Sequence, residues 1–132
     1  MSRDFRRAVV DTILPGEASL PSGTAAGVAI ADGDAPLLAA IAAAGGGEAA
    51  FAGGAEALRT EALRQVEREM PEAFRLLVAS LLADYYDSPT TLAALGWQSA
   101  PPQPSGHAMS QNDAALPTLL ERARRRGEVW RR

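Results

Sequence analysis

The sequence has no cysteine, no lysine and only one histidine among its 132 residues. Without cysteine, disulfides, thiolate metal ligands and cysteine nucleophiles are excluded. Without lysine, the glycine-rich stretch cannot be a Walker loop, which requires GxxxxGK[ST]. No apolar run approaches the roughly 20 residues that a membrane-spanning helix needs. The sequence therefore predicts no thiol chemistry, no P-loop and no membrane span.

Length and composition favour one small helical domain. The chain is 47% hydrophobic, but much of this content is alanine, which favours helices and buries little area per residue. The net charge of −3 argues against a generally basic nucleic-acid-binding protein. The charge is uneven, because residues 121–132 carry six arginines against two glutamates, which leaves −7 for the remainder. The C-terminal tail is thus a distinct basic segment.

The most apolar segment is residues 71–87, PEAFRLLVASLLADYYD. Its small and apolar residues Leu76, Ala79 and Ala83 form a second face, and a helix that is apolar on two sides is typically central. The main stripe, at helical spacing, consists of Phe74, Leu77, Val78, Leu81, Leu82 and Tyr85. We predict an all-α fold, a single-domain irregular bundle of five to seven helices around the helix at 71–87.

Caps and turn formers divide the rest of the chain. Ser2, Asp34 and Ser88 are expected N-caps, and Gly96 is expected to terminate a helix. Residues 45–54 are expected to be a mobile glycine-rich connection with Phe51 as an anchor, and residues 99–111 a proline-rich strap. The predicted further helices cover residues 2–14, 22–32, 35–44, 55–70, 88–95 and 112–126.

Few residues suggest catalysis. His107 lies in a Pro/Gly/Ser-rich segment without a neighbouring carboxylate pair at metal-ligand spacing, which favours a loop histidine over a metal site. Asp84 and Asp87 share a helix face beside Tyr86, and paired carboxylates can perform acid–base chemistry. Solvation, capping or ion pairing also explains such carboxylates. We therefore expect no catalytic residue, metal or cofactor, with a small enzyme or ligand site near Asp84, Tyr86, Asp87 and His107 as the alternative.

Aromatic and proline residues are the stronger binding candidates. A tryptophan beside glycine and proline either closes a small core or anchors a partner, and for Trp97 we expect closure of the core more than partner contact. Trp130, in the charged tail, is expected to contact a partner. A proline-stiffened segment loses less entropy on binding. The predicted partner-binding residues are Tyr85, Tyr86, Trp97, Pro101, Pro102, Pro104, His107 and Trp130.

Three segments carry a resemblance to a known family. They are DTILPG at 11–16, LPSGTAAGV at 20–28 and YYDSPTTLAALGW at 85–97. Together they resemble the gluconate 2-dehydrogenase subunit 3 family, whose members have an Asp-Thr-(Ile/Leu)-(Ile/Leu)-Pro-Gly step after the first helix and a late Gly-aromatic pair. The resemblance implies a non-catalytic helical subunit. Such a subunit binds, and helps mature or export, a large flavin-dependent dehydrogenase of the glucose-methanol-choline type.

Two features depart from the family pattern. Members typically begin with a twin-arginine export signal, whereas Arg6-Arg7 is not followed by an apolar segment. The strap and arginine tail after Trp97 are also less typical. We expect a cytoplasmic protein, or one exported to the periplasm as a passenger of its partner. The favoured function is an accessory or maturation subunit. A third hypothesis is a regulator whose arginine tail binds nucleic acid or acidic lipid.

Overall fold

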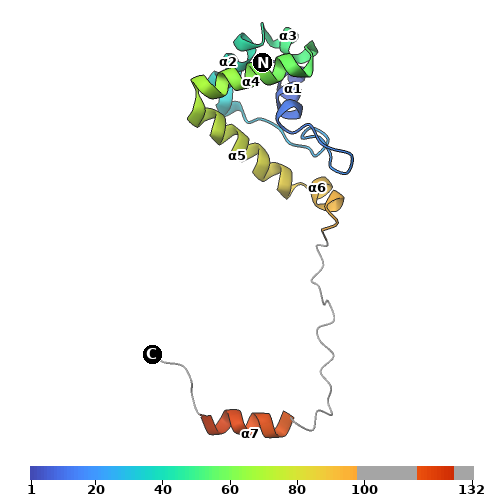
Figure 1. Ribbon diagram of the computed structural model, residues 1–132, viewed down its shortest axis with the longest axis vertical. Coiled ribbons are helices and arrows are strands. Elements are labelled where there is room, and N and C mark those ends of the chain that lie inside the picture. Colours follow the sequence, from blue (N-terminus) through green and yellow to red (C-terminus); the bar gives the residue numbers. More distant parts are fainter. Residues whose placement is uncertain (98–115, 127–132) are drawn as a thin grey trace. The chain divides into compact units, whose positions relative to one another are not determined.

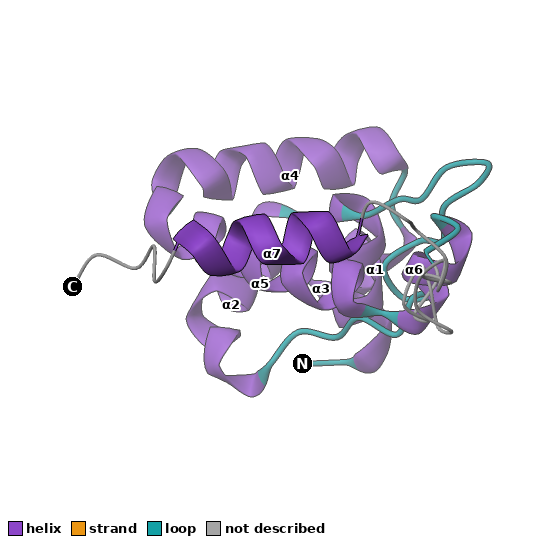
Figure 2. Ribbon diagram, turned by 90° about the horizontal axis from the view of Figure 1, so that it is seen from below, coloured by secondary structure: helices purple, strands orange, loops and turns teal. Residues whose placement is uncertain are grey.

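The computed structural model of the protein describes residues 1–97 and 116–126 (Figure 1). In these two stretches all regular structure is helical, as the colouring of Figure 2 shows, which confirms the predicted all-α class. The chain divides into two compact units, Met1–Ser99 and Ala100–Arg132, which we describe separately. The helices are α1 (Arg3–Ile13), the 3₁₀ helix η1 (Asp32–Asp34), α2 (Ala35–Ala44), α3 (Glu48–Gly53), α4 (Glu56–Glu69), α5 (Pro71–Asp87), α6 (Pro89–Ala94) and α7 (Leu116–Arg126).

Helix α1 contributes fully buried side chains to the core of the first unit. Phe5 and Val9 are fully buried, and the Phe5 ring meets the Phe51 ring of α3 edge to face, with centroids 5.4 Å apart. Ser2 caps the helix as predicted, because its Oγ accepts a hydrogen bond from the Phe5 N–H at 3.3 Å. Leu38 and Ile41 of α2 complete this part of the core. This part of the core therefore joins α1, α2 and α3.

The glycine-rich stretch at 45–54 is more ordered than the sequence predicts. Residues 48–53 form helix α3, so the expectation of a mobile connection is wrong for this segment. Phe51 is 1% exposed, which confirms it as the anchor of the stretch. The burial of one aromatic side chain, together with three helix-favouring alanines, outweighs the cost of the flanking glycines.

The predicted helix at 22–32 is reduced to one turn. The Ala26 N–H donates to the Ser22 carbonyl at 2.9 Å, and Gly27 then adopts a φ of +86°, which ends the turn. Beyond it the backbone has no regular structure up to η1, and the side chains alternate between buried Val28 and Ile30 and exposed Ala29. That alternation is typical of extended chain, so the helix prediction is wrong here.

Helix α5 has the predicted bounds, but only one of its two apolar faces is buried. Leu77, Leu81 and Tyr85 point into the core, whereas Leu76 is 60% exposed and Leu82 is 38% exposed. The helix packs mainly against α4 and α6, and these contacts cover one side only. The expected second contact face is therefore a surface. Leu58 of α4 and Leu95 after α6 are exposed as well.

The described part of the second unit is α7. Within this unit residues 117–126 are all exposed, including Leu119 and Leu120. Helix α7 lies within the predicted helix at 112–126, of which residues 112–115 lie outside the described residues.

Candidate functional site

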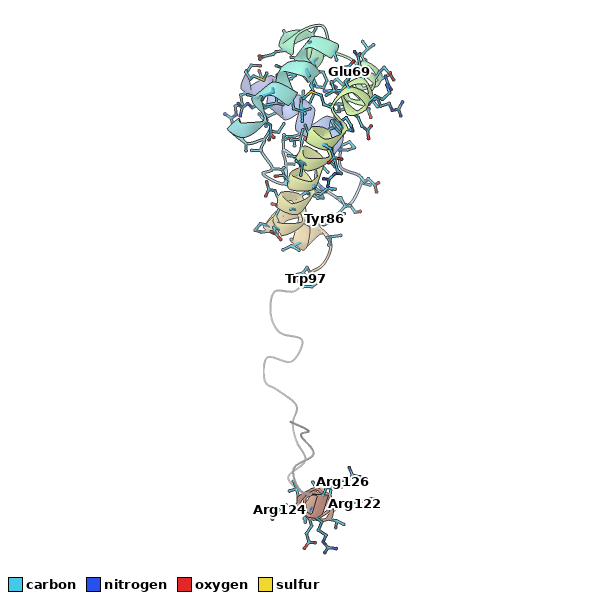
Figure 3. All side chains as sticks on the ribbon, turned by 90° about the vertical axis from the view of Figure 1, so that its left-hand side faces the viewer. Glu69, Tyr86, Trp97, Arg122, Arg124 and Arg126 are labelled. Carbon is cyan, nitrogen blue, oxygen red and sulfur yellow. The ribbon has the colours of Figure 1, made fainter. Side chains whose placement is uncertain are left out.

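Two of the predicted partner-binding aromatics lie on the surface of the first unit. Tyr86 is 55% exposed and Trp97 is 69% exposed, and Figure 3 shows both at the same end of this unit. The expectation that Trp97 closes the core is therefore wrong. The other predicted contacts, Pro101, Pro102, Pro104, His107 and Trp130, lie outside the described residues.

Tyr85 belongs to the core and not to the predicted surface. Its side chain is 5% exposed, and its hydroxyl donates a hydrogen bond to the Pro21 carbonyl at 2.7 Å. Because consecutive residues on a helix point about 100° apart, only one of the two tyrosines can face the core. The rings of Tyr85 and Tyr86 meet edge to face, with centroids 5.5 Å apart. The buried tyrosine thus supports the exposed one.

A second buried hydrogen bond fixes the end of α5. The Ser88 hydroxyl, which we expected to cap α6, instead donates to the Ala26 carbonyl at 2.6 Å. This bond and the one from Tyr85 attach the α5–α6 junction to residues 21–26, far earlier in the chain. Bonds of this kind hold Tyr86 on a rigid support.

Trp97 is positioned by the C-terminal cap of α6. The Trp97 N–H donates to the Leu92 carbonyl at 2.9 Å, and the Gly96 N–H donates to the Ala93 carbonyl at 3.0 Å. Gly96 has a φ of +70°, so the cap is a Schellman motif with glycine at the predicted C′ position. The backbone of Trp97 is therefore held in place while its indole is exposed.

The outer face of α5 is an apolar stripe that no other described element of the first unit covers. Leu76, Ala79, Ala83 and Tyr86 follow one another at intervals of three, four and three residues and are all exposed, and Leu82 flanks them. We call these five residues the outer face of α5. The sequence contained this stripe, but apolar character alone did not show whether another helix covers it.

Three of the four residues of the alternative enzyme site, Asp84, Tyr86 and Asp87, lie within the described residues. Asp84 and Asp87 are exposed and make no hydrogen bond or ion pair within the described stretches, and His107 lies outside them. No group of three or more His, Asp or Glu side chains in the described residues can hold a metal ion. A general acid or base acts together with other groups within hydrogen-bond reach of the substrate, and Asp84 and Asp87 have no such neighbour among the described residues.

Asp11 and Thr24, from two segments of the family resemblance, are hydrogen-bonded to each other. Thr24 donates from its backbone N–H at 2.9 Å and from its hydroxyl at 2.6 Å to the Asp11 carboxylate. Partial burial raises the pKa of Asp11, but the Thr24 bonds, a Ser22 bond and the charge of Arg7 together lower it below its usual value. The pair joins α1 to the turn at 22–28, a structural role.

Sequence reasoning missed a depression beside α1. It encloses about 320 Å³ and is lined by Arg3, Arg6 and Arg7 together with the segment at 27–30. Arg6 donates from Nη1 to the Ile30 carbonyl at 3.2 Å. The spacing of the three arginines places them on one helix face, a signal that the sequence carried. The depression can attract an acidic group, but no carboxylate, histidine or thiol lines it.

Comparisons of the chain with models of protein families, with curated proteins and with solved structures find no match. The resemblance to the gluconate 2-dehydrogenase subunit 3 family therefore stays a prediction. None of the described helices has the length and apolar character needed to cross a bilayer.

Proposed function

We propose that the protein is a non-catalytic accessory or maturation subunit that docks onto a larger protein through the outer face of α5 and Trp97. The observation that carries the proposal is the uncovered apolar stripe of α5, which ends at Tyr86, at the same end of the unit as Trp97. Soluble monomers rarely expose large contiguous apolar surface unless it binds something.

The two aromatic residues have the properties of interface anchors. Tyrosine and tryptophan dominate binding hot spots because they bury large areas with few rotatable bonds. Tyr86 rests against the hydrogen-bonded Tyr85 ring, and the backbone of Trp97 is fixed by the cap of α6. A surface held in this way loses little entropy on binding, which favours docking.

The partner we propose is a large flavin-dependent dehydrogenase of the glucose-methanol-choline type. This identity rests on the sequence resemblance of residues 11–16, 20–28 and 85–97. Two of these segments meet through the Asp11–Thr24 hydrogen bonds, and the third contains Tyr86 and Trp97. On this proposal the subunit meets its partner in the cytoplasm and reaches the periplasm only as a passenger.

The test is a pull-down of the tagged full chain from its own host, with bound proteins identified and eluates scanned for flavin absorbance. The double variant Tyr86→Ala/Trp97→Ala removes both anchors. Truncating a hot-spot aromatic costs about 2 kcal/mol or more, or roughly 30-fold in Kd. We expect the wild-type chain to recover a flavoprotein and the double variant to lose it.

The matched control is Leu58→Ala, which truncates a leucine that is 70% exposed on α4. Recovery of the flavoprotein by this variant shows that the loss is specific to α5 and Trp97. If the wild-type chain returns alone, or if the double variant retains the flavoprotein, the proposal is wrong. Recovery of a protein without flavin refutes the dehydrogenase as the partner.

A further inference from the structure

Helix α7 is amphipathic, and within its own unit no described residue covers its apolar side. Leu119 is 56% exposed and Leu120 is 51% exposed, and Ala123 is exposed beside them. At 3.6 residues per turn these three side chains lie within one face of about 100°. This face is separate from the outer face of α5, so a role for α7 does not depend on the proposed function.

Arginines lie along both edges of this apolar face. Arg122 and Arg126 line one surface depression together with Leu119 and Ala123, which places them along one edge. Arg124 follows Leu120 by four residues and lies along the other edge. Figure 3 shows Arg122, Arg124 and Arg126 around the helix. None of the three forms an ion pair within the described residues.

The acidic residue of α7 is turned away from the apolar face. Glu121 pairs with Arg125 at 3.9 Å, and both lie on the opposite side of the helix. The apolar face is therefore bordered only by positive charge. In contrast, residues 1–97 carry seven arginines against thirteen acidic residues, so the positive charge of α7 is a local property.

The positive charge along both edges of the apolar face of α7 complements the negative charge of an anionic bilayer surface. An amphipathic helix lies in the plane of the membrane with its leucines below the headgroups, while arginines at both edges reach the phosphates beside it. Nucleic acid accounts for the arginines but leaves the leucines in water. A protein groove accounts for the leucines but would need acidic residues on both of its rims.

We propose that α7 is a membrane-surface anchor that binds bilayers containing anionic phospholipid, with Leu119, Leu120 and Ala123 facing the acyl region and Arg122, Arg124 and Arg126 facing lipid phosphates. The helix lies on the membrane and does not span it.

The test is co-sedimentation of the purified full chain with vesicles of phosphatidylcholine alone or of an equal mixture of phosphatidylcholine and phosphatidylglycerol. We expect binding to the anionic vesicles only. Binding should fall steeply when ionic strength rises from about 0.01 M to about 1 M, because the screening length drops from about 30 Å to about 3 Å. Equal binding to both vesicle types overturns the proposal.

Two variants separate the two contributions to binding. Arg122→Gln/Arg126→Gln is expected to weaken binding about 25-fold, since each arginine near an anionic surface contributes about fivefold. The matched control Arg64→Gln/Arg75→Gln removes the same charge from exposed arginines of the first unit and should leave binding within about twofold. If both variants lose vesicle binding equally, the proposal is overturned, because the net charge of the whole protein then explains the binding.

Substituting the two leucines of α7 measures how much the apolar face contributes to vesicle binding. Leu119→Gln/Leu120→Gln is expected to weaken vesicle binding by at least about tenfold, whereas Leu58→Gln on α4 should have no effect. Polyglutamate and a DNA duplex serve as anions without an apolar phase. If the leucine variant binds vesicles normally, or if these polymers bind as tightly as the vesicles do, α7 is a general polyanion-binding segment and the membrane proposal is wrong.

Discussion

At the scale of single residues, Asp11 has the best-defined role in the described chain. Its carboxylate accepts hydrogen bonds from the backbone and hydroxyl of Thr24. A hydrogen bond to a charged group contributes about 1.5–3 kcal/mol, and partial exposure reduces this. We predict that Asp11→Ala lowers the free energy of unfolding by about 1–2 kcal/mol, measured by urea denaturation. As a control, Asp84→Ala should change it by less than about 0.5 kcal/mol, because Asp84 is exposed and makes no such bond.

Asp11 also predicts a pH dependence of stability. The pKa of Asp11 lies below its usual value of 3.8, because hydrogen bonds and Arg7 outweigh its partial burial. A carboxyl with a lower pKa in the folded state stabilises the fold above its unfolded pKa, and this contribution is lost as pH falls through its folded pKa. The stability difference between wild type and Asp11→Asn should be constant above a pH of about 5 and vanish in strong acid. A difference that grows on acidification contradicts this sign.

At the scale of elements, α3 depends on one side chain. Phe51 is 1% exposed and contacts the Phe5 ring, while the rest of this short helix consists of alanine, glycine and Glu48. Phe-to-Ala substitution in a core typically costs about 3–5 kcal/mol. We predict a loss of about this size for Phe51→Ala in urea denaturation, with Leu58→Ala nearly neutral because Leu58 is exposed. A mild effect would mean that residues 45–54 behave as the mobile connection that their composition predicts.

The cap of α6 allows a second prediction at this scale. Gly96 has a φ of +70°, a conformation that costs other residues roughly 1–2 kcal/mol. Gly96→Ala should destabilise the first unit by about 1 kcal/mol and loosen Trp97, seen as a weaker near-UV circular dichroism signal in a Trp130→Phe background. Gly33→Ala is the matched control, since a Cβ there meets nothing within 4 Å and Gly33 lacks a positive φ. An unchanged signal in Gly96→Ala would show that the cap does not hold Trp97.

At the scale of the whole molecule, the hydrophobic core formed by the described residues lies within the first unit. Every residue of the buried cluster falls between Phe5 and Tyr85. We therefore predict that a chain ending after Ser99 unfolds in urea with the same midpoint and slope as the full chain, because the slope reports the surface exposed on unfolding. The same truncation should abolish binding to anionic vesicles while leaving partner capture intact. A lower slope would place part of the core in residues 100–132.

Much of the fold was predictable from local signals. Ser2, Pro71 and Gly96 mark helix ends through bonds and steric limits that span only a few residues, so the sequence alone locates them. The predicted helix at 71–87 and the predicted all-α class are both confirmed, because they also depend on local signals. The local signals were insufficient where weak preferences compete, as at 22–32, where Gly27 limits the helix to one turn.

The candidate site was predictable only in part, because burial depends on residues far away in the chain. The sequence identified the adjacent tyrosines of α5 and marked Trp97 as notable. Tertiary structure decided that Tyr85 bonds to the Pro21 carbonyl while Tyr86 faces outward, and that no other helix of the first unit covers Trp97 or Leu76. By itself, therefore, the sequence determined which segments are helical and where they end, since backbone hydrogen bonds are local. Only the packing of distant segments decided which apolar faces form the core and which are exposed.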